Sequence, residues 1–150
     1  MKLNAYKKFG LMLLISFVIM YAVMFLNVDQ FSHIYLSYTR VYMTLLMIAP
    51  MAILMLLMMP QMYPDSVKNL VILSVSILVF VLALAGLRKQ VFISDIQYMQ
   101  AMIPHHSSAI LTSEQANLKD PEVQQLAKDI IRAQKKEIAQ MKQRIEDLSK

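Results

Sequence analysis

The sequence contains no cysteine and no tryptophan among its 150 residues. Without cysteine, the chain cannot form disulfides, thiolate zinc sites, iron–sulfur clusters or a cysteine nucleophile. Glycine is also scarce, with only two residues, and no glycine-rich phosphate-binding loop occurs. Because no nucleophile–base constellation is recognisable either, we expect a protein that is not an enzyme and has no catalytic residues.

Charge is scarce as well. Charged residues make up 17% of the chain and hydrophobic residues 57%, which argues against disorder and for a membrane protein. Long uncharged runs predict transmembrane helices at about 9–26, 41–59 and 67–87, so residues 1–89 form a predicted three-span transmembrane region. A cleaved signal peptide is the alternative for the first run, because three lysines precede it.

The distribution of lysine and arginine predicts the orientation in the membrane. Lys2, Lys7 and Lys8 precede the first span, which favours a cytoplasmic N-terminus under the positive-inside rule. Three crossings then place residues 90–150 on the outer face. Arg88 and Lys89, just after the third span, weigh in the opposite direction.

Residues 90–150 have the periodicity of two amphipathic helices. Apolar residues recur at alternating spacings of four and three on both sides of Asp120-Pro121, an expected helix start, which predicts a helical hairpin. A lone hairpin cannot enclose a core, so we expect two chains to pair into a four-helix bundle, as a homodimer or higher homo-oligomer. Residues 88–150 have ten Lys and Arg against eight Asp and Glu, without a basic stripe for nucleic acid. The predicted fold is an all-α membrane protein with an extramembrane hairpin.

Methionine and histidine interrupt the apolar stripes of this hairpin. Met99, Met102, His105 and His106 lie within about two helical turns, and Met141 lies on the facing stripe. Thioether and imidazole together suit a soft ion, chiefly Cu(I), for which silver could substitute. The simpler interpretation is that the methionines pack in the core and that His106 bonds Gln134 there.

The string Met-Ile-Pro-His-His at 102–106, followed by Gln-x-x-Glu-Ile-x-x-Met at 134–141, resembles the domain of unknown function 305 family. The resemblance covers the C-terminal third of the chain. It implies a ferritin-like helical fold for residues 90–150, and some family members are periplasmic copper-binding proteins. It also implies copper ligands at Met99, Met102, His105, His106 and Met141, with Gln134 and Glu137 as supporting residues. A bacterial inner membrane with a periplasmic hairpin is the implied location.

The predicted function is therefore that of a membrane-anchored copper-binding protein for envelope metal handling or tolerance, working with an envelope metal-handling protein. One alternative is a structural or assembly protein that dimerises through the hairpin without metal. Another is a copper-conducting or haem-binding membrane protein. Methionines recur every four residues in the second span, as a ladder of thioethers for conduction or as apolar filler: Met43, Met47, Met51, Met55 and Met59.

Overall fold

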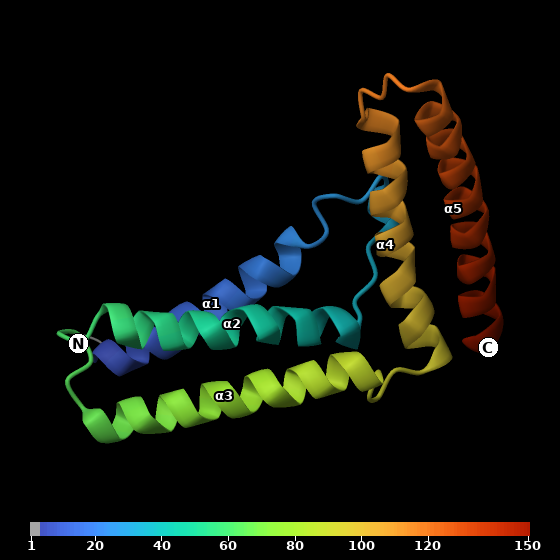
Figure 1. Ribbon diagram of the computed structural model, residues 1–150. Coiled ribbons are helices and arrows are strands. Elements are labelled where there is room, and N and C mark those ends of the chain that lie inside the picture. The colour runs from blue at the N-terminus through green and yellow to red at the C-terminus, as the bar shows by residue number, and fades with distance from the viewer. Residues whose placement is uncertain (1–3) are drawn as a thin grey trace. The chain divides into compact units, whose positions relative to one another are not determined.

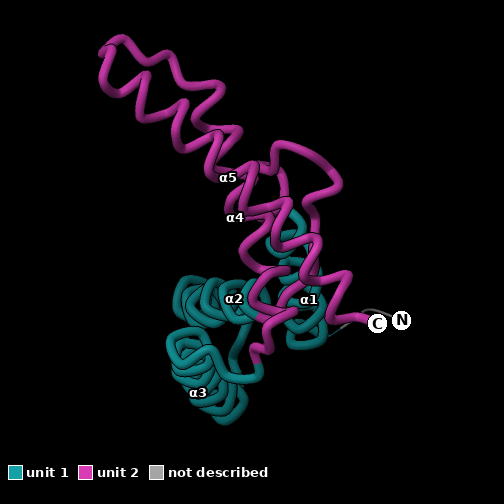
Figure 2. The backbone as a smooth tube through the Cα atoms, turned by 90° about the vertical axis from the view of Figure 1, so that its right-hand side faces the viewer, with its two compact units in different colours: residues 1–23, 39–92 teal, residues 24–38, 93–150 magenta. Residues whose placement is uncertain are grey.

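The computed structural model describes residues 4–150, and within them the chain is all helical, with five α-helices, one short 3-10 helix and no strand. The chain forms two compact units, coloured separately in Figure 2. The first unit contains residues 1–23 and 39–92, of which residues 4–23 and 39–92 are described, and the second contains residues 24–38 and 93–150. The expected all-α architecture is confirmed.

Three helices are long and apolar enough to cross a membrane: α1 (Ala5–Val23), α2 (Tyr38–Met58) and α3 (Ser66–Lys89). Helix α1 begins a few residues before the predicted span at 9–26. It also ends a few residues earlier than predicted, because the chain turns at 24–27. Helix α3 begins after Asp65, whose side chain accepts a hydrogen bond from the Lys68 backbone N–H and caps the helix. The three apolar segments that the sequence predicts are therefore helices of membrane-spanning length.

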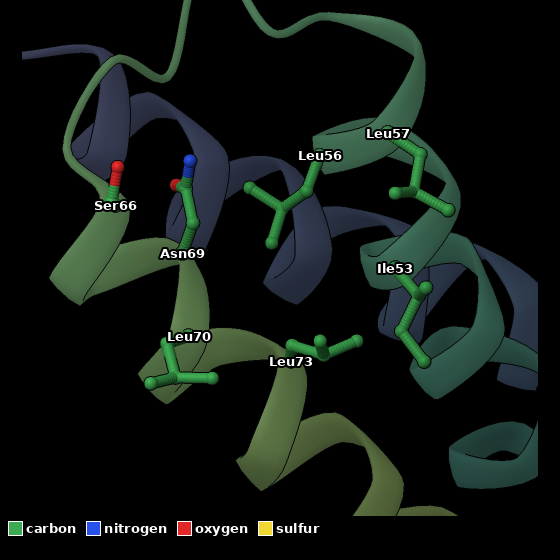
Figure 3. Close-up of a pocket in the computed structure, with 7 residues that line it drawn as sticks. All are labelled: Ile53, Leu56, Leu57, Ser66, Asn69, Leu70 and Leu73. Atoms are coloured by element: carbon green, nitrogen blue, oxygen red, sulfur yellow. The ribbon is translucent and has the colours of Figure 1, made fainter.

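A small aromatic cluster joins the three helices of the first unit at one end. Phe9, Ala52 and Tyr63 are buried together, and the rings of Phe9 and Tyr63 meet edge to face. The Tyr6 hydroxyl lies 3.0 Å from the Asn69 side-chain oxygen. Beside this cluster, leucine and isoleucine side chains of α2 and α3 line an open apolar groove with Ser66 and Asn69 at one end (Figure 3).

The second unit is built on an antiparallel hairpin of α4 (Asp95–Gln115) and α5 (Pro121–Leu148) (Figure 1). Ser94 caps α4, and the Asp120 carboxylate caps α5 by accepting hydrogen bonds from two backbone N–H groups, with Pro121 in the first turn. The hairpin that the spacing predicts is thus present. Helix α4 continues through Pro104, which is buried.

Three isoleucines form the core between α4 and α5. Ile103 and Ile110 of α4 are 0% exposed, and Ile138 of α5 is 4% exposed. Ile131, Met141 and Ile145 of α5 pack around them. These are seam positions of the sequence, because a spacing of seven residues returns to the same helix face after two turns.

The segment 24–38 between α1 and α2 also belongs to the second unit. It contains the short 3-10 helix η1 (Phe31–His33), and Tyr35 packs against the isoleucine core. From the sequence, this segment is expected only to connect two spans. In the structure it supplies a third layer to the hairpin, so part of the core is covered without a second chain.

Candidate metal centre

The predicted site residues lie on α4 and α5, whose antiparallel packing decides which of them meet. His106 and Glu137 are the pair that the structure brings together, with Nδ1 of His106 3.0 Å from Oε2 of Glu137. The His106 side chain is 13% exposed, whereas the Glu137 side chain is 48% exposed. A nearly buried imidazole therefore meets a carboxylate that water can still reach.

Burial controls the protonation of His106. Desolvation lowers the pKa of His106 below its ordinary value, the charge of Glu137 opposes this shift, and neighbouring His105 adds to it. His106 is consequently a neutral imidazole at pH 7. A neutral imidazole has one ring nitrogen with a free lone pair, which is the form that binds a metal ion.

Two buried polar atoms of the hairpin have no aligned hydrogen-bond partner among the described residues. One is Nδ1 of His106, which is close to Glu137 but not in hydrogen-bond geometry with it. The other is Oε1 of Gln134 on α5. Buried polar groups without a partner are rare and costly in folded proteins. A ligand bound in this part of the hairpin could supply the missing partner for the two atoms.

The three predicted thioethers lie on the same two helices as this pair. Met99 is buried, Met141 is partly buried, and both line one open depression of about 580 Å³ together with polar residues of α5. One helical turn from His106 toward the start of α4 lies Met102, and one turn from Glu137 toward the end of α5 lies Met141. Because the helices are antiparallel, Met102 and Met141 stand at the same level of the hairpin.

His105 is the predicted ligand that the structure separates from the others. Its side chain is exposed, and its ring centroid lies 6.1 Å from that of His106. Consecutive helical residues point about 100° apart, so His105 cannot share the inward direction of His106. The structure therefore shows two groupings of predicted site residues: His106 with Glu137, and Met99 with Met141 along one depression.

No three His, Asp or Glu side chains converge anywhere in residues 4–150. A hard-ligand site of the zinc or di-iron type would need such a group. The donor set in the hairpin is instead imidazole and thioether sulfur with one neighbouring carboxylate. This donor set fits a soft monovalent ion better than a hard divalent one.

Residues of the segment 24–38 next to this site were missed by the sequence analysis. His33 is 5% exposed, and its Nδ1 lies 2.8 Å from the Oγ of Ser107, which directly follows the His-His pair. The Asp29 backbone N–H donates to the same Oγ at 2.7 Å. The available signal was a lone histidine in a short segment between two apolar runs, which by itself does not identify its partner.

The methionine ladder of α2 does not lie on a single surface. Met43 and Met47 of α2 are exposed, as is Met59, one residue after the helix ends, whereas Met51 and Met55 are partly buried. A four-residue repeat turns slightly more than a full helical turn at each step, so the stripe winds around the helix. Whether these sulfurs carry an ion stays a prediction.

These observations define a class of protein with three apolar helices of membrane-spanning length and a helical hairpin that carries a His-Met-Glu cluster. The family model described as domain of unknown function (DUF305) matches residues 82–148, which confirms the resemblance inferred from the hairpin. The uncharacterized protein L153 of Acanthamoeba polyphaga mimivirus is 37% identical over 134 residues, covering 87% of this chain and 86% of its own length. The chain belongs to the DUF305 family. No solved structure matches it.

Proposed function

We propose that this protein is a membrane-anchored Cu(I)-binding protein that buffers the ion or passes it to an envelope metal-handling partner, and that silver substitutes for copper. It works as a binding module without turnover. The observation that supports this most directly is the nearly buried His106, whose Nδ1 lies 3.0 Å from the Glu137 carboxylate without hydrogen-bond geometry, on the same hairpin as Gln134 Oε1, which has no hydrogen-bond partner among the described residues. A bound soft ion would satisfy the imidazole nitrogen and take thioethers as its other ligands.

The chemistry of the cluster favours capture at neutral pH. Burial lowers the pKa of His106, so no proton has to leave the ring when the ion binds at pH 7. Glu137 supplies a negative charge at 3.0 Å from the ring, which offsets the positive charge of a bound cation. The Met141 sulfur lies on an open depression, so an ion has a route from solvent.

We further propose that α1, α2 and α3 anchor the chain in a bacterial inner membrane with the hairpin in the periplasm, and that two hairpins pair. Apolar side chains on the hairpin surface support pairing. Tyr98 is 53%, Val123 44% and Leu126 58% exposed. A second copy would cover such a surface as a four-helix bundle does.

A chelator competition on the purified full chain tests the metal proposal. We expect the wild type to take Cu(I), and Ag(I) as a redox-stable substitute, at a defined stoichiometry. The combined variant Met102→Leu, His105→Asn and His106→Asn should lose affinity on the order of 100-fold or more, because each lost ligand or support weakens a site strongly.

The control variant also replaces one methionine, but at a position outside the hairpin. Met58→Leu in α2 changes a side chain that is 72% exposed and should leave the affinity unchanged. Absence of Cu(I) binding in the wild type, or equal affinity in the combined variant, would refute the proposal. Such a result, together with retained self-association, would favour an assembly protein that pairs through the hairpin.

A further inference from the structure

The segment between α1 and α2 is held on α4 by one buried hydroxyl. Ser107 is 0% exposed, and its Oγ accepts the Asp29 backbone N–H at 2.7 Å. The same Oγ lies 2.8 Å from Nδ1 of His33. When His33 is neutral with its proton on the other ring nitrogen, Nδ1 accepts the Ser107 O–H, and the hydroxyl is satisfied as both donor and acceptor.

The other attachments of residues 27–35 that the structure shows are mostly polar. The Asn27 side-chain amide donates to the Ser108 Oγ at 2.7 Å, in an exposed position. Lys142 of α5 reaches the Ser32 Oγ at 3.4 Å. Tyr35 provides the apolar contact with the isoleucine core. Segments with few buried apolar contacts open at low free-energy cost, so a change at the buried His33–Ser107 contact can decide whether this segment stays docked.

The charges around His33 come from two elements. Lys142 faces it from α5 and Asp29 from its own segment, while α4 contributes the uncharged Ser107. Burial and the Lys142 ammonium disfavour the imidazolium more than Asp29 favours it, so the pKa of His33 lies below 6.5. Protonation would also place a proton on Nδ1 and remove the acceptor for the Ser107 hydroxyl.

We infer that residues 27–35 form a proton-sensitive latch on the hairpin, closed while the buried His33 accepts the Ser107 hydroxyl and released when His33 is protonated. The inference goes beyond metal binding and does not depend on it. The direction of the pH dependence follows from the linkage between proton binding and docking. The pKa of the docked His33 lies below the value of 6.5 that a released ring would have, so the released state binds more protons. The latch is fully closed above about pH 6.5. As the pH falls below this value, the equilibrium constant for docking decreases by up to about tenfold per pH unit.

Hydrogen exchange on the purified full chain, without metal, tests the latch. Peptides covering residues 27–35 should be protected at pH 7.5 and should lose protection by up to about tenfold per pH unit between 6.5 and 5, after correction for the intrinsic exchange rate. Peptides of α5 should lose less protection than residues 27–35, because only the smaller effect of His106 protonation acts on them. Unchanged protection of residues 27–35 over this range would overturn the inference.

A non-titrating variant separates the latch from the other histidines. His33→Asn places an amide oxygen where Nδ1 accepts and leaves His105 and His106 in place, so residues 27–35 should stay protected at both pH values. If this variant loses protection at low pH as the wild type does, His33 is not the sensor and the inference fails.

If His33→Asn does not dock even at pH 7.5, the wild-type titration decides. The His33 ring resonance, assigned by its loss in the variant, should titrate below pH 6.5 together with the loss of protection. A His33 pKa at or above 6.5 would overturn the inference. Because every readout is made without metal, failure of the latch and failure of the copper proposal are independent results.

Discussion

Replacing Gln134 by leucine should stabilise the metal-free hairpin while weakening its response to a soft ion. Gln134 is partly buried on α5, and within residues 4–150 its Oε1 has no hydrogen-bond partner. A buried polar group without a partner costs about 1–3 kcal/mol relative to a satisfied one. Gln134→Leu removes this group and keeps a side chain of similar size, so we expect a gain of about 1–2 kcal/mol in the free energy of opening α5, as most of that cost is recovered.

Hydrogen exchange of the α5 amides in the full chain measures this free energy directly. The matched control is Gln125→Leu on the same helix, because Gln125 is exposed, lies outside the depression lined by Met99 and Met141, and its replacement should change the free energy by no more than about 0.5 kcal/mol. The second readout is the stabilisation by added Ag(I), which grows with ligand concentration over Kd. That stabilisation should shrink in Gln134→Leu and remain in Gln125→Leu.

The reasoning would be refuted if Gln134→Leu destabilised α5 by more than about 1 kcal/mol, since that is the cost of losing a made hydrogen bond. Greater stability with an unchanged Ag(I) response would show that Gln134 is unpaired but does not support the ion. Leucine is chosen over methionine because it adds no sulfur that could ligate silver.

Three further predictions concern the core, the electrostatics and the helix start. Ile110→Ala empties a site that is 0% exposed and should cost about 2–5 kcal/mol in the unfolding of the hairpin, measured by hydrogen exchange. Leu148→Ala, at a 55% exposed position, should cost far less, and equal effects would contradict the packing. Glu137→Gln removes the charge that raises the pKa of His106, so an NMR titration should show that pKa falling further below 6.5; a rise would contradict the assigned causes. Since this pKa is lowered, the neutral ring supports folding fully above about pH 6.5 and that contribution is lost as the pH falls, in the wild type as in the variant. Asp120→Ala removes the acceptor for two backbone N–H groups and should cost about 0.5–2 kcal/mol at the start of α5, measured by protection of its first turn; unchanged protection would show that the cap is dispensable.

The helices of both units were predictable because each rests on a short-range pattern. A run of apolar residues as long as a bilayer core is recognisable without knowing its neighbours. The hairpin followed from alternate spacings of four and three, and its second helix begins at the Asp120-Pro121 pair that the sequence marks. The family was equally visible, because the Met-Ile-Pro-His-His string and the Gln-x-x-Glu-Ile-x-x-Met string are local.

The pairing within the candidate site was only partly predictable. Seam spacing placed His106 and Met141 on inward faces, and the structure keeps them there. Helix spacing could not predict the register between α4 and α5. This register brings His106 next to Glu137 and places Met102 at the same height along the hairpin as Met141. His105 shows the same limit of the sequence. The family motif predicts it as a ligand, but its position on the helix leaves its side chain exposed.

What the sequence by itself determined is the set of segments: three apolar helices, two amphipathic ones and a family motif on the hairpin. What only the tertiary structure decided is the role of residues 24–38. A segment without regular periodicity gives no signal for its partner, and the contact of His33 with Ser107 joins residues 74 positions apart. The burial of this polar pair depends on which surfaces of the chain cover one another, as do the meeting of His106 with Glu137 and the exposure of His105. This is a property of packing that no local pattern encodes.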